Sequence, residues 1–131
     1  MKADILASLI AILWLTGGSF NDQVKDGSST YSRRAYLAGR AAAERDTKRG
    51  ILAVESVGLK PEWSGEYVRL LKRRYNIEDR CVAGCVVDDK IIGHLRGYNE
   101  VSNAEITRRF GSDIFDRIDD EAHTLYKKEY P

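Results

Sequence analysis

The sequence predicts a small α+β domain, in which a three-stranded mixed sheet is packed with four helices after an N-terminal hydrophobic segment. Two segments, residues 51–57 and 80–98, are rich in branched residues, which favour strands. Elsewhere apolar residues recur at helical spacing. The 131 residues, of which 43% are hydrophobic and 31% charged, supply enough chain for one core and too little for two. We therefore expect a single folded domain.

The first segment of the chain, MKADILASLIAILWLTGGSF, differs in kind from the rest. Lys2 precedes a largely apolar run over residues 5–15, and small residues follow it, which is the order of a secretory signal peptide. The run is shorter than the roughly 20 residues that a membrane-spanning helix needs. We interpret residues 1–19 as a signal peptide or a membrane anchor. Because Asp4 weakens the positive flank and no A-x-A site follows, a helix packed on the core or on a partner is the alternative.

Residues 20–30 are polar and show no period, so they are predicted to form a linker. The single α+β domain is then expected over residues 31–131, and it begins with a helix. Ser29 or Thr30 is the expected N-cap of this helix. Gly50 stands where a left-handed residue usually ends a helix.

This first helix carries a stripe of very small side chains. Ala35, Gly39 and Ala43 recur every four residues and therefore lie on one face. Such a face lets another backbone approach closely, while the arginines of the same helix exclude its burial in lipid. We expect the stripe to pack on a sheet or helix of the same domain.

The next two elements are predicted to be a strand and a helix. Residues 51–57, ILAVESV, are short, branched and followed by a glycine, as strands often are. Residues 61–75 carry aromatic and leucine side chains at helical spacing, and Asn76 is the expected left-handed stop. If the strand joins the remaining sheet, this helix forms a right-handed crossover to a parallel neighbour.

Residues 80–98, RCVAGCVVDDKIIGHLRGY, are predicted to form a β-hairpin with two aspartates at its turn. In the expected register Gly84 faces Gly93, which leaves a shallow trough floored by backbone on one face of the sheet. We expect Gly39 and Ala43 of the first helix to pack into this trough. A ligand bound in the trough is the alternative.

The opposite face of the hairpin carries the candidate ligand-binding residues His94, Arg96 and Tyr98. They stand at i, i+2 and i+4, so a regular strand points all three the same way. An imidazole that exchanges protons, a guanidinium that holds a carboxylate or phosphate, and a phenol can together bind a polar ligand. No nucleophile stands at fixed spacing from them, so we assign no catalytic residues. An ordinary polar sheet face is the alternative.

Both cysteines of the chain, Cys81 and Cys85, lie in the first arm of this hairpin. A strand separates their Cα atoms by about 13 Å, whereas a disulfide requires about 7 Å or less. Two thiols also fall short of the four ligands of a structural zinc site. We predict that they are small buried residues, and we predict no disulfide, metal site or cofactor.

Two helices are predicted after the hairpin. Ser102 and Glu105 form a capping box for a short helix, which Gly111 ends. The last helix begins at Ser112 or Asp113. It is acidic early and ends in lysines, an order that suits the helix dipole.

Twenty-one Lys and Arg against 20 Asp and Glu leave a formal charge of +1, so no global field favours nucleic acid. Catalytic motifs such as H-E-x-x-H and G-x-S-x-G do not occur in the sequence. Together with the leader and the small size, this predicts a non-catalytic periplasmic or secreted protein that binds another protein, as an inhibitor, an immunity protein or an accessory subunit does.

Two alternative functions remain at this stage. One is a small-ligand-binding protein or enzyme built around His94, Arg96 and Tyr98. The other is a membrane-attached subunit of a larger assembly, which keeps residues 1–19 and contacts the membrane through them. The sequence does not predict an oligomeric state.

Overall fold

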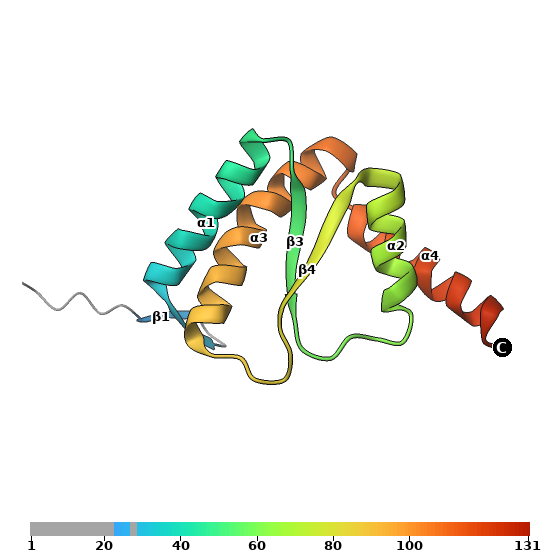
Figure 1. The fold of residues 1–131 in the computed structure, drawn as a ribbon, viewed down its shortest axis with the longest axis horizontal. Helices are drawn as coiled ribbons and strands as arrows, with labels where there is room; N and C mark the ends of the chain where they lie inside the picture. Colours follow the sequence, from blue (N-terminus) through green and yellow to red (C-terminus); the bar gives the residue numbers. More distant parts are fainter. Residues whose placement is uncertain (1–22, 27–28) are drawn as a thin grey trace, which may run out of the picture.

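The computed structural model describes residues 23–26 and 29–131, so the predicted signal peptide or anchor over residues 1–19 lies outside the described residues. The elements in chain order are β1 (Gln23–Asp26), β2 (Ser29–Ser32), α1 (Arg33–Lys48), β3 (Leu52–Val57), α2 (Ser64–Tyr75), β4 (Ile77–Ala83), α3 (Asp89–Phe110) and α4 (Ile114–Glu129). They form an α+β fold with four helices, as predicted (Figure 1). None of the helices in this described part is long and apolar enough to cross a membrane.

The central sheet consists of β3 and β4, which run parallel and pair Leu52 with Ile77. α2 connects the two strands, so the predicted crossover to a parallel neighbour is present. α1 and α3 lie on one side of this sheet, and α2 and α4 lie on the other (Figure 1). β1 and β2 pair as a separate antiparallel hairpin, most of which falls in the segment predicted as a linker.

The ends of the first two helices follow from local chemistry. Asn76 has a φ of 52° and ends α2, as predicted. The N-cap of α1 is Ser32, whose hydroxyl accepts a hydrogen bond from the backbone N–H of Ala35 at 3.3 Å. The predicted caps Ser29 and Thr30 belong instead to β2, because the chain stays extended up to Ser32.

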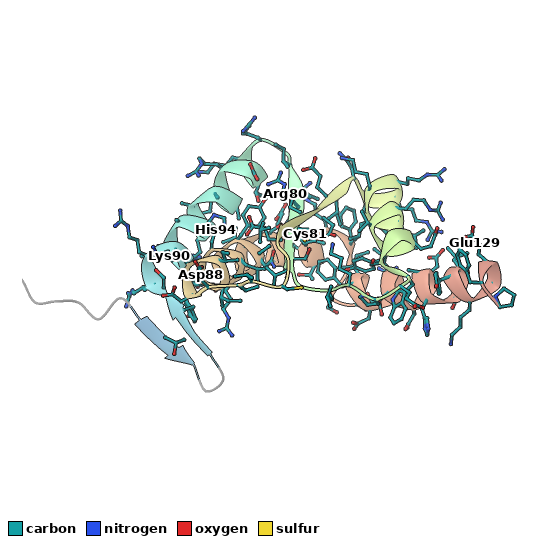
Figure 2. The ribbon with its side chains drawn as sticks, turned by 60° about the horizontal axis from the view of Figure 1, so that its bottom comes forward. Arg80, Cys81, Asp88, Lys90, His94 and Glu129 are labelled. Atoms are coloured by element: carbon teal, nitrogen blue, oxygen red, sulfur yellow. The ribbon has the colours of Figure 1, made fainter. Side chains whose placement is uncertain are left out.

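The predicted β-hairpin over residues 80–98 is wrong. Its first arm is part of β4, but its second arm is the beginning of the 22-residue helix α3. The carboxylate of Asp88 accepts hydrogen bonds from the backbone N–H groups of Lys90 at 3.0 Å and Ile91 at 2.8 Å (Figure 2). An N-cap of this kind satisfies donors that are otherwise free at a helix start, so the aspartates expected at a turn begin a helix instead. The sheet of β3 and β4 therefore has two strands where three were predicted.

The capping box predicted at Ser102 is also wrong, because α3 is continuous through it. Ser102 is buried within the helix, and its hydroxyl donates a hydrogen bond to the carbonyl oxygen of Ala53 in β3. The predicted end of this helix is confirmed, since Gly111 caps it with a φ of 102°.

α1 and α3 pack with their backbones in contact. A Cβ atom added at Gly39 would lie 2.0 Å from the carbonyl oxygen of His94. One added at Gly97 would lie 2.0 Å from the carbonyl oxygen of Tyr36. Non-bonded carbon and oxygen atoms do not approach so closely, so each position admits only glycine unless the helices move apart.

The trough predicted between Gly84 and Gly93 does not exist, because the two residues belong to a loop and to a helix. A Cβ atom added at Gly93 would lie 2.4 Å from the carbonyl oxygen of Ser32, whereas one added at Gly84 would have no atom within 4 Å. Gly39 and Ala43 are buried, as their stripe suggested. The stripe faces the glycines of α3, and Ala43 also packs with Ala53 of β3.

Two hydrophobic clusters lie on opposite faces of the β3–β4 sheet, because successive strand residues point to opposite sides. The larger cluster joins the sheet to α2, α3 and α4 through the buried residues Leu52, Leu70, Leu71, Ile77, Ile106, Ile114, Ile118 and Ala122. The smaller cluster, on the α1 side, consists of Ala43, Ala53 and Tyr98. α3 contributes to both clusters, through Ile106 and Tyr98.

α3 also closes the outer edge of β3. The side-chain oxygen of Asn99 accepts a hydrogen bond from the backbone N–H of Glu55 at 2.8 Å, and its side-chain nitrogen donates to the carbonyl oxygen of the same residue at 2.7 Å. The hydroxyl of Ser102 also donates a hydrogen bond to the carbonyl oxygen of Ala53. These three bonds engage the backbone groups of β3 that a third strand would otherwise hydrogen-bond. Side chains of α3 therefore occupy the edge of β3 at which a strand of the predicted hairpin would have paired.

Candidate functional site

The structure brings together two of the three predicted ligand-binding residues. His94 and Tyr98 are one helical turn apart on α3, and their ring centroids lie 6.3 Å apart. Arg96 points elsewhere, with its guanidinium carbon 5.0 Å from the ring centroid of Tyr31. Residues at i and i+2 share a face of a strand but not of a helix, so the wrong element type explains the misplaced Arg96.

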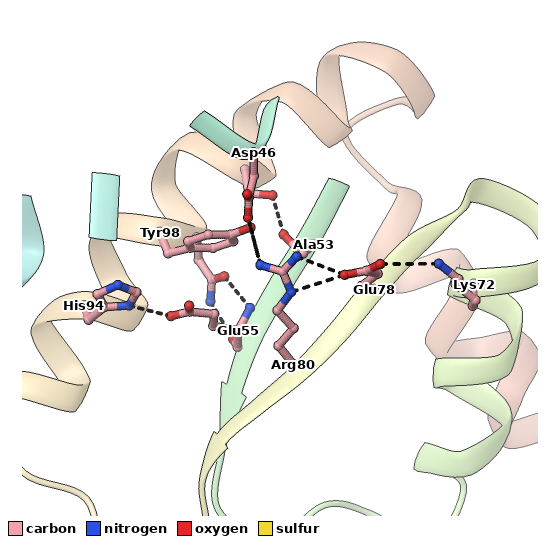
Figure 3. Close-up of polar contacts among 10 residues, drawn as sticks. Asp46, Ala53, Glu55, Lys72, Glu78, Arg80, His94 and Tyr98 are labelled. Carbon is pink, nitrogen blue, oxygen red and sulfur yellow. Dashed lines mark hydrogen bonds and ion pairs between the residues drawn. The ribbon is translucent and has the colours of Figure 1, made fainter. Parts of the chain in front are cut away.

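His94 pairs with a buried carboxylate of β3. Its Nδ1 lies 2.9 Å from Oε2 of Glu55, whose side chain is only 7% exposed (Figure 3). The imidazole itself is 39% exposed. The contact joins α3 to β3 and leaves one part of the imidazole ring at the surface.

Tyr98 belongs to a second group of polar contacts, which joins α1, α3 and β4. Its hydroxyl donates to Oδ2 of Asp46 at 2.7 Å, and the guanidinium of Arg80 donates to the same oxygen at 2.8 Å (Figure 3). Arg80 also donates to Glu78 at 2.9 Å. The hydrogen bonds from Tyr98 and Arg80 lower the pKa of Asp46, whereas burial and the bond to Asp46 raise the pKa of Tyr98. The arginine beside Tyr98 is therefore Arg80 of the neighbouring strand and not Arg96.

Asp46 is expected to make stability depend on pH below about 4. Because the pKa of Asp46 is lowered in the folded chain, its contribution is fully present above the ordinary aspartate pKa and is lost as the pH falls through the lowered value. Asp46→Asn should lower the free energy of unfolding at pH 7 by about 1 kcal/mol. It should also flatten the fall of that free energy below about pH 4.

Urea unfolding followed by circular dichroism across this pH range measures both effects. Asp120→Asn, on the exposed face of α4, is the matched control and should keep the pH profile of the parent. A profile for Asp46→Asn that equals the parent's contradicts the role assigned to Asp46.

A groove opens between the β3–β4 sheet, α2, α3 and α4, and we call it the Asp79 groove. It has two adjoining lobes of about 260 Å³ and 190 Å³, which share Ser56, Tyr67 and Asp79. The first lobe is further lined by Val54, Glu55, Asn99, Asn103 and Phe115, and the second by Lys60, Pro61, Trp63, Ser64 and Asp119. The groove adjoins the carboxyl-terminal end of β3, the part of a parallel sheet where ligands commonly bind.

Asp79 lies where the two lobes meet, and its side chain is only 6% exposed. The hydroxyl of Ser56 donates to its Oδ1 at 2.9 Å, and the ammonium of Lys60 forms an ion pair with its Oδ2. Burial, followed by the nearby carboxylates of Asp119 and Asp79, raises the pKa of Tyr67 to about 12. The groove is therefore acidic in character, and the phenol of Tyr67 keeps its proton at physiological pH.

Asn103 supplies the groove with an acceptor that lacks a donor. Its Oδ1 is buried and has no hydrogen-bond partner within the part of the chain that the structure describes. Asn103 lines the first lobe and also an adjoining hollow near Tyr31 and Arg96. An unpaired buried acceptor costs about 1 to 3 kcal/mol. Native folds rarely retain such a group unless a ligand or water pairs with it.

Exposed apolar side chains occur at the end of β4 and on the loops that follow β3 and β4. Leu59 is 90% exposed and Val86 is 87% exposed, while Val82 at the end of β4 is 42% exposed. A hydrogen bond of 3.0 Å from the backbone N–H of Gly58 to the carbonyl oxygen of Ala83 ties the two loops together. Both loops leave the sheet at the same end (Figure 1). We call Leu59, Val82 and Val86 the loop edge.

The predicted burial of the two cysteines is wrong. Cys81 and Cys85 are free thiols and are exposed (Figure 2, where Cys81 is labelled). Burial required a second hairpin arm beside them, but β4 ends at Ala83 and the chain continues into a loop.

Sequence reasoning missed Lys60, Asp79 and Asn103 as site residues. The alternation of β4 places Asp79 on the same face as the buried Ile77, which is a signal for a buried carboxylate. Asn103 gives no local signal, because its environment depends on how α3 crosses the sheet. Comparison of the chain with protein-family models, with curated proteins and with solved structures finds no match.

Proposed function

We propose that this chain is a non-catalytic protein of the cell envelope or of the extracellular space, and that it binds another protein through the loop edge. The exposure of Val82 at the end of β4, and of Leu59 and Val86 on the loops that follow β3 and β4, is the observation that supports this proposal. Apolar side chains gathered at a surface commonly mark a site of protein interaction. Their removal from water on docking contributes roughly 25 cal/mol per Å² of apolar surface.

The Asp79 groove beside the loop edge favours a partner that carries positive charge. Asp79 and Asp119 present carboxylates in its lining, and Lys60 is the one basic side chain among the described residues that line it. Complementary charge increases the rate of association and selects between partners. We therefore expect the partner to present an apolar segment that includes a basic residue.

The proposed location rests on residues 1–19, whose order matches an export signal. An intact-mass measurement on protein purified from the native host tests it. A mature chain that lacks about the first 19 residues agrees with export and cleavage. An intact Met1 end excludes cleavage and favours the membrane-attached subunit.

Site-specific photo-crosslinking in the native host tests the docking surface. A photoreactive residue in place of Val86 should capture one protein species, whereas the same residue in place of Leu37, which is 53% exposed on α1, should not. Leu59→Ser combined with Val82→Ser should abolish the product formed at Val86, because docking loses its apolar contact. Leu37→Ser should leave that product unchanged. Equal capture at both positions, or a product that survives the double substitution, contradicts the proposal.

Small-ligand binding is the second candidate function, and the Asp79 groove with the unpaired acceptor of Asn103 favours it. The site expected at His94, Arg96 and Tyr98 is not assembled, because Arg96 lies against Tyr31. A small ligand is therefore better placed in the groove than at the predicted triad.

A further inference from the structure

The charges that line the Asp79 groove favour a cationic occupant. Asp79, with a side chain 6% exposed, lies where the two lobes meet, and Asp119 lines the second lobe. Glu55 also lines the first lobe, but its carboxylate pairs with His94 on the opposite face of the sheet. Among the described residues that line either lobe, Lys60 is the single basic side chain. The weakly solvated walls of a groove strengthen the attraction for a cation.

The unpaired acceptor of Asn103 favours an occupant that can donate a hydrogen bond. Its Oδ1 is buried and receives no hydrogen bond from the described residues, and Asn103 lines the first lobe. A quaternary ammonium has no N–H group and provides no hydrogen bond to this oxygen. An occupant with several N–H donors satisfies Asn103 and a carboxylate together.

Aromatic side chains favour a flat cation. Tyr67 and Phe115 line the lobe that contains Asn103, and Trp63 lines the adjoining lobe. The Nε1 of Trp63 donates to Asp119 at 2.9 Å, so its polar edge is engaged by a carboxylate. A planar guanidinium stacks on aromatic faces and offers five donors, whereas an ammonium is a compact and strongly hydrated charge.

The protein already places one cation of its own in the groove. Lys60, on the loop between β3 and α2, extends its ammonium to Asp79. This contact shows that the carboxylate accepts an N–H cation at that position. An incoming cation that reaches Asp79 must displace Lys60 or share the carboxylate with it.

We propose that the Asp79 groove binds a guanidinium group, which an arginine of the partner protein presents, and that Lys60 competes for the same carboxylate. The source of the guanidinium rests on the proposed function, since it assumes that a protein docks on the loop edge. The binding site itself does not depend on that function. It is defined by Asp79, Asn103 and the aromatic walls.

Methylguanidinium is the probe, and methylurea is its neutral near-isostere. Titration of the full chain, followed by two-dimensional NMR, should give saturable shifts at the indole N–H of Trp63 and at the side-chain amide of Asn103 with methylguanidinium and none with methylurea, and the Trp63 signal reports the affinity of the Asn103 variant. Asp79→Asn should weaken the affinity at least 10-fold. Asn103→Leu should weaken it at least 3-fold, and it keeps the test valid if Asp79→Asn fails to fold. Lys60→Met should strengthen the affinity at least 3-fold, because the competing ammonium is gone.

The control variant is Asp120→Asn, which removes an exposed carboxylate of α4 outside the groove and should leave the affinity unchanged. Three results overturn the proposal. The first is that methylguanidinium gives no saturable shift up to tens of millimolar, and the second is that methylurea gives the same response. The third is that Asp79→Asn and Asn103→Leu both bind methylguanidinium as tightly as the parent protein does.

Two further measurements separate this inference from the proposed function. Leu59→Ser with Val82→Ser should abolish the crosslink at Val86 but leave methylguanidinium binding unchanged. A capped arginine peptide that binds as tightly as methylguanidinium agrees with a side chain as the source, whereas a peptide that does not bind contradicts the partner arginine. If the crosslink persists while methylguanidinium does not bind, only the guanidinium site fails.

Discussion

Gly97→Ala is expected to destabilise the protein by at least about 3 kcal/mol, the upper end of what overpacking usually costs. The new Cβ would lie 2.0 Å from the carbonyl oxygen of Tyr36 and 3.0 Å from the backbone nitrogen of Arg40. Backbone atoms cannot turn aside as a flexible side chain does, so α1 and α3 must separate along their shared face.

Urea unfolding of the purified variants measures this loss. Gly65→Ala is the matched control, because an added Cβ there has no atom within 4 Å and the residue also lies in a helix. It should be neutral or slightly stabilising, since alanine favours a helix more than glycine does. A Gly97→Ala protein as stable as Gly65→Ala would show that the two helix backbones are not in contact.

Asn99→Ala is expected to cost about 2 to 4 kcal/mol, because it leaves two enclosed backbone groups without partners. The side chain of Asn99 now pairs with both the N–H and the carbonyl oxygen of Glu55, which is 8% exposed. No strand is available within the described residues to replace these bonds at the edge of β3.

Asn103→Ala is the control, since it removes the same side chain one turn later on the same helix. It deletes an unpaired acceptor, so the free energy of unfolding should stay the same or rise slightly. Chemical denaturation of the two variants side by side gives the comparison. Equal losses in both would mean that Asn99 does not act as the substitute for a strand.

Parts of the fold could be predicted because their signals are local. The apolar spacing over residues 61–75 and the stop at Asn76 were sufficient to predict α2. The branched residues over 51–57 were sufficient to predict β3. The parallel pairing followed from the helix between two strands. Each of these features depends on neighbours in the sequence and not on distant contacts.

The hairpin over residues 80–98 failed because two signals conflict there. Ile91 and Ile92 favour a strand, and Gly93 and Gly97 disfavour a helix interior. The spacing of four between these glycines is helical, and it matches the stripe of α1, so close packing of the two helices outweighs the weak local preferences.

The candidate site was predictable only in part, for the same reason. His94 and Tyr98 share a face in a strand and also in a helix, so the error in element type did not separate them. Arg96 was misplaced because a spacing of two is specific to strands. Asp79 and Asn103 meet in one groove only through the crossing of α3 over the sheet, which no local pattern encodes.

The length of α3 has a consequence for how the molecule unfolds. At about 1.5 Å per residue the helix is roughly 33 Å long, and it supplies Tyr98 to one hydrophobic cluster and Ile106 to the other. Neither cluster can open without exposing part of α3 to solvent, so the two sides of the two-stranded sheet are expected to unfold together. Amide protons at the centre of α3 should therefore exchange with solvent only through global unfolding, whereas the ends of α1 and α4 open locally.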